Sequence, residues 1–249
     1  MKKTLTMSLA LAGIAGLVLA DVSIETPPAG YIEKAGSAAA LLVSNPFGSL
    51  TGAAPTLGDL DGSSLTANDY VKIISEKGKT LFTAKYSASA TPAGWYDGES
   101  CSNAFPLARG TSIQFYSPNG GGTLVIAGLV QNGGAELELI AGHNFIGNVS
   151  AKKIDLRDIS VSAFAPLGGE YAMVNNTKVV WVPSAVARRV GLSQGWYLYS
   201  DINGSHPENA TDIMGSEAAG TGWFINAGEG FRVYVKKSAG ATITLPGLN

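Results

Sequence analysis

The sequence predicts an all-β protein made of two tandem, internally duplicated modules, each a β-sandwich or barrel-like unit, with at most one short helix. Two observations predict this class. Short runs of β-branched and aromatic residues recur along the chain, separated by Gly, Pro, Asn and Ser. Several sequence motifs also recur about 100 residues apart, as expected for a repeated structural unit.

The repeat is defined by motifs that match between the two halves of the chain. The matches are 45–48 with 144–147, 57–60 with 156–159, Tyr70 with Tyr171, 94–96 with 195–197, and Gly110, Ile113 and Tyr116 with Gly228, Phe231 and Tyr234. The offset grows late in the repeat, so we place one inserted loop at about 198–215. This predicts β module 1 at 31–131 and β module 2 at 132–249.

The first 20 residues have the features of a secretory signal peptide. Lys2 and Lys3 precede an apolar stretch, and Val18 and Ala20 stand at the positions that a signal peptidase recognises. The alternative is a retained anchor, but the apolar run is shorter than the roughly 20 residues that span a bilayer. We therefore expect a secreted or cell-surface bacterial protein, with no membrane contact after cleavage.

Residues 21–30 predict an N-terminal strand followed by a proline linker. Apolar and polar side chains alternate before the two prolines in the candidate assembly strand Val22, Ser23, Ile24, Glu25 and Thr26. The favoured interpretation is that this strand completes its own sheet, and the alternative is that it pairs with a neighbouring subunit by strand addition. The chain has few charged residues, so little electrostatic repulsion would oppose the pairing of its strand edges with those of another copy.

Each module has a similar series of predicted strands. We expect them at 71–74, 80–83, 112–116 and 123–126 in the first module, and at 171–174, 179–182, 230–235 and 242–245 in the second. The turns 118–122 and 236–240 predict a hairpin between the last two strands of each module. A short helix is predicted at 183–190, because Gly191 is a natural stop.

The composition excludes some classes of partner. The net charge is −2 and 14% of residues are charged, so we expect no nucleic-acid partner. The one cysteine, Cys101, cannot form an intramolecular disulfide. We expect it to be buried as a small apolar residue, with pairing between subunits or a nucleophilic role as alternatives.

The sequence contains no catalytic motif that predicts an enzyme. The two histidines, His143 and His206, are too few for a His-rich zinc site. A Gly-x-Ser-x-Gly nucleophile elbow is missing, and the glycine run 120–122 lacks the Lys-Ser/Thr of a phosphate-binding loop. We expect a non-catalytic protein that needs no cofactor.

Aromatic residues near the repeated Gly-Trp-Tyr motif are candidates for stacking on a sugar ring. They are Trp95, Tyr96, Trp196, Tyr197 and Tyr199. The structural alternative is favoured, because an aromatic residue kept in both copies is expected to anchor the core. The repeated glycines, Gly110 and Gly228, predict backbone positions where a side chain would not fit.

A calcium site is a further candidate within the inserted loop. Asp201, Asn203 and Asp212 place oxygen ligands at spacings similar to those of a calcium-binding loop. The loop departs from the EF-hand pattern, with His206 where glycine is required. A solvated turn is the favoured alternative, for this loop and for the similar segment 59–63.

Several segments carry a resemblance to a known family. They are Pro28-Ala29-Gly30-Tyr31-Ile32, Leu41-Leu42-Val43-Ser44-Asn45-Pro46-Phe47, Asp69-Tyr70-Val71-Lys72-Ile73-Ile74 and Thr123-Leu124-Val125-Ile126-Ala127-Gly128-Leu129-Val130. Together they resemble a verrucomicrobial-type family of exported β-rich repeat proteins of unknown function, mainly over the first repeat. The resemblance implies export and a β-rich fold, and supplies no activity or catalytic residues.

These patterns lead to two functional hypotheses of different classes. The first is an exported structural protein, a subunit of an extracellular filament or surface assembly that is joined to copies of itself through strand edges. The alternative is a secreted carbohydrate-binding module that binds a polysaccharide through its aromatic residues. A secreted hydrolase ranks below both, because no pair of carboxylates stands out in the sequence.

Overall fold

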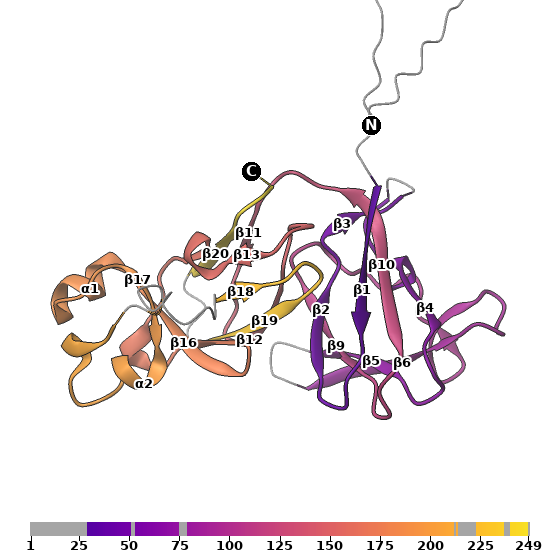
Figure 1. The fold of residues 1–249 in the computed structure, drawn as a ribbon, viewed down its shortest axis with the longest axis horizontal. Helices are drawn as coiled ribbons and strands as arrows, with labels where there is room; N and C mark the ends of the chain where they lie inside the picture. Colours follow the sequence, from indigo (N-terminus) through magenta and orange to yellow (C-terminus); the bar gives the residue numbers. More distant parts are fainter. Residues whose placement is uncertain are drawn as a thin grey trace, which may run out of the picture.

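A computed structural model describes residues 29–50, 53–74, 79–211, 213, 223–236 and 240–248. The expected signal peptide and the candidate assembly strand lie outside these residues. The described chain consists mainly of strands in antiparallel sheets, which confirms the predicted all-β class. Figure 1 shows two lobes side by side, one from each half of the sequence, here called module 1 and module 2.

Module 1 contains a large and a small sheet. The large sheet has the order β2 (Leu41–Ser44), β9 (Ser112–Tyr116), β5 (Tyr70–Ile74), β6 (Thr80–Ser87), β7 (Gly94–Asp97) and β8 (Ser100–Cys101). The small sheet has the order β1 (Ala29–Ala35), β10 (Thr123–Val130) and β3 (Phe47–Gly48), and β4 (Leu60–Ser64) also pairs with β10. Burial alternates along β5 and β10, so each sheet turns one face inward.

Module 2 repeats this plan. Its main sheet has the order β12 (Gly142–Gly147), β19 (Gly230–Val235), β15 (Tyr171–Val174), β16 (Thr177–Val182) and β17 (Gly195–Leu198). Its second sheet has the order β11 (Ala135–Glu138), β20 (Thr242–Leu245) and β14 (Ser160–Val161), and β13 (Ile154–Asp155) pairs with β18 (Phe224–Ile225).

The two modules share one strand order. The path β2-β9-β5-β6-β7 of module 1 is matched, strand by strand, by β12-β19-β15-β16-β17 of module 2. The path β1-β10-β4 is matched in the same way by β11-β20-β14. This shared order is what an internal duplication would produce, although the duplication itself stays a prediction.

The predicted match between 45–48 and 144–147 differs by four residues from the correspondence that the strand pairings give. The strand pairings place Ser44 opposite Ser112, and Gly147 opposite Gly230. Asn45 therefore corresponds to Asn148, which follows Gly147. Each of these two asparagines accepts a hydrogen bond on its side-chain oxygen from the backbone N–H two residues later. A shared turn fixes the correspondence, whereas the earlier match rested on letter identity alone.

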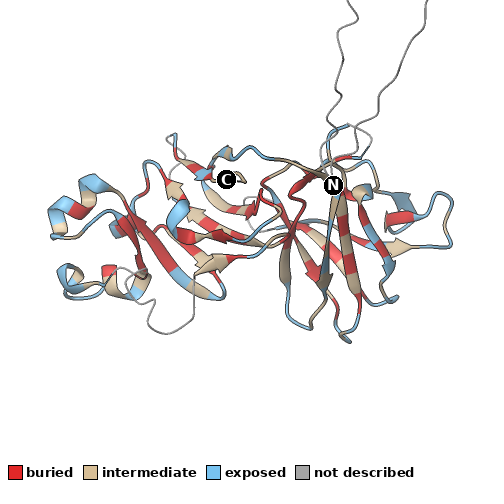
Figure 2. Cartoon of the chain, turned by 45° about the horizontal axis from the view of Figure 1, so that its top comes forward, coloured by how far each residue is buried: buried red, intermediate tan, exposed pale blue. Residues whose placement is uncertain are grey.

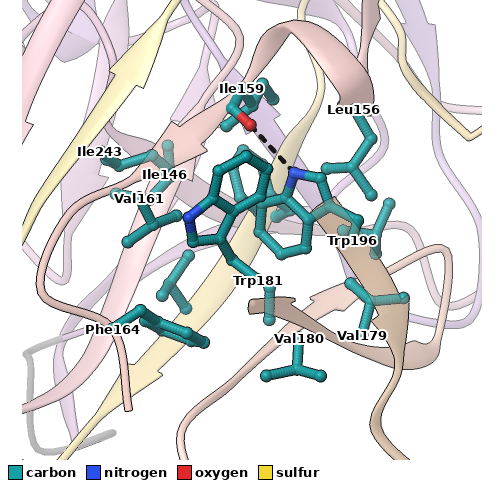
Figure 3. Close-up of a cluster of buried hydrophobic side chains, with 14 of the residues drawn as sticks. Ile146, Leu156, Ile159, Val161, Phe164, Val179, Val180, Trp181, Trp196 and Ile243 are labelled. Carbon is teal, nitrogen blue, oxygen red and sulfur yellow. Dashed lines mark hydrogen bonds between the residues drawn. The ribbon is translucent and has the colours of Figure 1, made fainter. Parts of the chain in front are cut away.

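Each module has its own cluster of buried apolar side chains, visible as separate red bands in Figure 2. A tryptophan lies in each cluster. Trp95 Nε1 donates to the carbonyl of Leu60 at 2.8 Å, and Trp196 Nε1 donates to the carbonyl of Ile159 at 2.9 Å. Figure 3 shows the second bond, with Trp181 packed beside Trp196. Leu60 and Ile159 occupy matched positions, so both cores are anchored in the same way.

The predicted strands and the predicted helix are present, but the two hairpins were wrong. β9 pairs with β2 and β5, whereas β10 pairs with β1, β3 and β4. β19 and β20 likewise lie in different sheets. Both strands of each pair turn a buried face toward the same core from opposite layers, so the turn carries the chain between sheets.

The helical content is small and follows local sequence signals. Helix α1 spans Ser184–Val190 and ends at Gly191, whose φ of 75° is left-handed. The inserted segment at 198–215 holds the single turn α2, Tyr199–Ile202, and the 3-10 helix Pro207–Asn209. Neither α-helix of the described residues has the length and apolar character to cross a membrane.

Candidate functional site

The modules meet through backbone hydrogen bonds that obey an approximate twofold relation. Ser44 N donates to Gly228 O at 3.0 Å, and Gly147 N donates to Gly110 O at 2.8 Å. Ser44 corresponds to Gly147, and Gly110 corresponds to Gly228. Exchanging the two modules therefore turns one bond into the other. The contact joins β2 and β9 of module 1 to β12 and β19 of module 2, at the centre of Figure 1.

Small residues allow this close approach. A Cβ added to Gly147 would lie 2.4 Å from the Cβ of Ser44, and one added to Gly230 would lie 2.5 Å from the Cβ of Ser112. Real Cβ atoms do not approach so closely, and in each case the two residues that face each other occupy matched positions. Only one member of each pair can carry a side chain. The interface therefore requires a glycine in one module opposite a serine in the other.

The repeated glycines behave as predicted. Gly110 has a φ of 89° and Gly228 a φ of 70°, both in the region that favours glycine. A Cβ on Gly110 would meet Leu137 at 2.9 Å, and one on Gly228 would meet Lys34 at 3.0 Å. In both cases the residue that would be met belongs to the other module. These glycines thus shape the interface as well as their own turns.

Two clefts flank the contact, and they differ in chemistry. The first, the polar cleft, has a volume of about 430 Å³. Its lining includes Lys34, Leu42 and Gln114 of module 1 and Phe145, Met173, Asn175, Asn176, Asn226, Glu229 and Arg232 of module 2. This size lies within the range of 300–1,000 Å³ that is usual for ligand sites.

Most charges in the polar cleft are already paired. Lys34 Nζ lies 3.0 Å from Glu229 Oε1, and Asn226 Nδ2 donates to Glu229 Oε2 at 2.9 Å. Arg232 differs, because its guanidinium makes no hydrogen bond or ion pair with any described residue, and its Nε atom is buried without a partner. The cleft therefore holds one uncommitted cation, on β19 directly opposite Phe145 of β12.

His143 lies next to this cation on the same sheet. Burial lowers the pKa of His143 first, and the charge of Arg232 lowers this pKa further. The imidazole is consequently held in its neutral form, its Nδ1 is buried without a partner among the described residues, and its ring lies 5.0 Å from that of Tyr234. The neutral His143 therefore adds no second positive charge beside Arg232.

The second cleft, the apolar cleft, also lies along the contact, shares Phe145 with the polar cleft and has a volume of about 470 Å³. Ile73, Leu81 and Phe105 of module 1 and Leu137, Ile140 and Phe145 of module 2 contribute to its lining. Leu81 is 61% exposed and Ile140 is 43% exposed. This side of the interface thus presents apolar surface to solvent.

Three of the five candidate stacking residues lie in the core, as the favoured structural alternative predicted. Trp95, Trp196 and Tyr197 are at most 2% exposed and so cannot stack on a sugar. Their ring area is used for core packing, the favoured alternative. Tyr96 and Tyr199 are half-buried and lie in different modules, so the structure does not bring them together.

A pair of tyrosines is found on the outer face of each module instead. Tyr70 stacks on Tyr116 with ring centroids 4.9 Å apart, and Tyr171 lies 5.3 Å from Tyr234. Lysines lie over both pairs, Lys72 in module 1 and Lys178 in module 2. The repeat contained the signal for these pairs, since all four tyrosines are matched residues.

Strand β1 is the described strand edge nearest to the candidate assembly strand. Among the described residues β1 pairs with β10 alone, so its other edge has no partner there. Tyr31 is 69% exposed on this strand, and Glu33 is also exposed. The candidate strand itself, Val22 to Thr26, lies outside the described residues, and its pairing stays a prediction.

The calcium candidates lie in and after α2. Asp201 accepts a hydrogen bond from Ser200 Oγ at 3.0 Å, and Asn203 Nδ2 donates to Tyr199 O at 3.2 Å. Asp212 is outside the described residues. Within the described part of the chain, no three His, Cys, Asp or Glu residues are grouped so as to hold a metal ion. Calcium binding here stays a prediction.

Burial of Cys101 was a wrong expectation. Cys101 is exposed at the end of β8, a two-residue strand at the edge of its sheet. Such a strand has no covering layer, so its side chains remain in water. Pairing between subunits stays open as a prediction for this thiol.

Comparisons with known proteins give no match: no protein-family model, no curated protein and no solved structure is similar to this chain. The resemblance to exported repeat proteins therefore stays a prediction.

Proposed function

We propose that the protein is an exported, non-catalytic subunit of an extracellular filament or surface assembly, joined to other copies through β-strand edges. The edge of β1 is the observation that carries this proposal. The unpaired N–H and C=O groups of an edge strand are a template for a strand from another chain. Seven residues of β1 are paired with β10, so the other edge is held extended and ready to pair.

The prolines before β1 favour pairing between subunits over pairing within one chain. A tight two-residue hairpin needs positive φ at one or both central residues, whereas proline fixes φ near −65°. Pro27 and Pro28 are the residues that separate the candidate strand from β1. The strand at 22–26 is therefore poorly suited to fold back on β1, and we propose that it reaches the β1 edge of a neighbouring copy.

The rigid joint between modules supports a structural role. Matched hydrogen bonds and glycine contacts hold the two lobes in one arrangement, and subunits of fixed shape can repeat regularly along a polymer. Carbohydrate binding through Trp95 and Trp196 has lost its support, since both are buried.

Electron microscopy of the purified protein tests the proposal. The wild-type protein should form filaments or sheets, and Val22→Asp with Ile24→Asp should abolish them because the inserted strand loses its apolar face. Tyr31→Asp should do the same, because it places a second negative charge beside Glu33, on the edge that a strand carrying Glu25 must approach. The matched control is Leu167→Asp, at a 53% exposed position of module 2, which should still polymerise.

Monodisperse wild-type particles at every concentration would exclude assembly through strand edges. Polymers that persist in both edge variants would move the contact away from β1 and would contradict the proposal equally. Circular dichroism of each variant establishes that the fold is intact before either result is interpreted.

A further inference from the structure

The uncommitted guanidinium of Arg232 indicates that the polar cleft binds an anionic group. A guanidinium has five N–H donors, and a buried donor without a partner destabilises the protein. The guanidinium of Arg232 makes no hydrogen bond or ion pair with any described residue, and its Nε is buried, so a ligand in the cleft would contact its Nη groups. A carboxylate would satisfy two of these donors at once, through the bidentate geometry that arginine favours.

The charge of the cleft limits the kind of anion. Glu229 neutralises Lys34 and also accepts from Asn226, so these groups offer no further positive charge. Arg232 remains as a single cation among the described lining residues. A cleft with one unpaired positive charge suits a ligand that carries one carboxylate on each sugar ring. It does not suit a densely charged polyphosphate or nucleic acid.

The remaining lining suits a sugar. Asn176 makes no hydrogen bond with a described residue, and Gln114 uses only its side-chain oxygen, which accepts from Tyr116 at 3.0 Å. Their amide groups can therefore donate to and accept from hydroxyl groups. Phe145 and Met173 are half-buried beside them and provide apolar surface for the C–H face of a ring.

We propose that the polar cleft binds a uronate-containing oligosaccharide, with Arg232 holding the carboxylate and the amides of Gln114 and Asn176 contacting hydroxyl groups. The site is built from both modules, so it exists only when they are packed as observed. It is separate from the β1 edge and does not depend on assembly.

Isothermal titration calorimetry with defined trisaccharides tests the site. Trigalacturonate should bind, and its methyl ester should bind at least tenfold more weakly because esterification removes the charge. Arg232→Gln should weaken trigalacturonate binding by at least tenfold. The matched control Arg188→Gln, at an exposed position of α1, should bind like the wild type.

A second variant covers the case that Arg232→Gln does not fold. Asn176→Asp changes an exposed turn residue with a φ of 61°, a conformation that Asp tolerates, and places a negative charge in the cleft. It should weaken binding at least threefold, whereas the matched change Asn119→Asp in an exposed turn of module 1 should have no effect.

Three results would overturn the proposal. They are equal binding of trigalacturonate and its ester, unchanged binding in a folded Arg232→Gln variant, and no binding of trigalacturonate at millimolar concentration. Competition by inorganic phosphate as strong as that by galacturonate would likewise show an unspecific anion site. Filaments seen by microscopy in any of these cases would leave the assembly proposal standing, so the two failures are distinguishable.

Discussion

The hydrogen bond between Trp196 and Ile159 makes a prediction that can be worked out from the structure. Trp196→Phe removes the indole N–H, so the buried carbonyl of Ile159 loses this donor. An unsatisfied buried acceptor costs about 1–3 kcal/mol. The smaller ring also leaves a cavity, which we set at about 1–2 kcal/mol because a complete truncation of Trp costs 3–5 kcal/mol.

Trp181 supplies a matched control in the same core. Its ring centroid lies 5.5 Å from that of Trp196, and it is 7% exposed (Figure 3). The indole N–H of Trp181 makes no hydrogen bond with a described residue, so Trp181→Phe makes only the cavity, at about 1–2 kcal/mol. The difference between the two variants isolates the hydrogen bond and should be about 1–3 kcal/mol.

Urea unfolding followed by circular dichroism measures this difference, since each substitution changes the tryptophan fluorescence itself. The free energy of unfolding is taken from the midpoint and slope of each transition. Equal midpoints for Trp181→Phe and Trp196→Phe would refute the reasoning, because the bond would then contribute nothing beyond packing. Trp95→Phe tests module 1 in the same way, because its indole donates to Leu60.

Three further predictions concern the joint between the modules, acid stability and the thiol. Arg109 Nε donates to Val149 O at 3.0 Å across the joint, so Arg109→Ala should cost about 1–3 kcal/mol and separate the unfolding of the modules in calorimetry. The folded pKa of His143 is lowered, so the unfolded state binds more protons near pH 6; stability should fall below about pH 6.5, and His143→Gln should flatten this dependence of the urea midpoint. Cys101 is exposed, so native protein without denaturant should react with a thiol reagent as fast as a free thiol does.

Alternation and turn residues correctly predicted eight of the strands, but they could not predict which strands pair. The strands β9 and β10 have the same pattern that a hairpin would have, and a glycine-rich turn joins them. Their separation into two sheets depends on packing across the core, which local sequence does not encode. Strand β1 was not predicted. Pro27 and Pro28 directly precede it and Gly30 lies within it, and these residues weaken the alternating pattern that marks a strand.

The candidate site could not be predicted because it lies between modules. Arg232 on β19 and Gln114 on β9 are 118 residues apart, and the cleft exists only after the two lobes have packed. Nothing in the residues around Arg232 shows that its guanidinium lacks a partner. Trp95 and Trp196 were candidates for ligand binding because they recur at matched positions. They recur because both pack in a core.

Comparison of matched positions separates structure from function in this chain. Positions that keep their residue type in both modules, such as Trp95 with Trp196 and Gly110 with Gly228, hold the core and the joint together. The two clefts differ where matched residues differ. Lys34 lines the polar cleft and faces Gly228, whereas the matched Leu137 lines the apolar cleft and faces Gly110.

A twofold scaffold with identical side chains would present two identical clefts. The observed chain has one polar and one apolar cleft, and the difference comes from substitutions at the rim that the packing of the joint does not require. Binding in one cleft alone is therefore the expected outcome. Arg232→Gln, which removes the one unpaired cation of the polar cleft, should weaken binding at least tenfold without disturbing the joint.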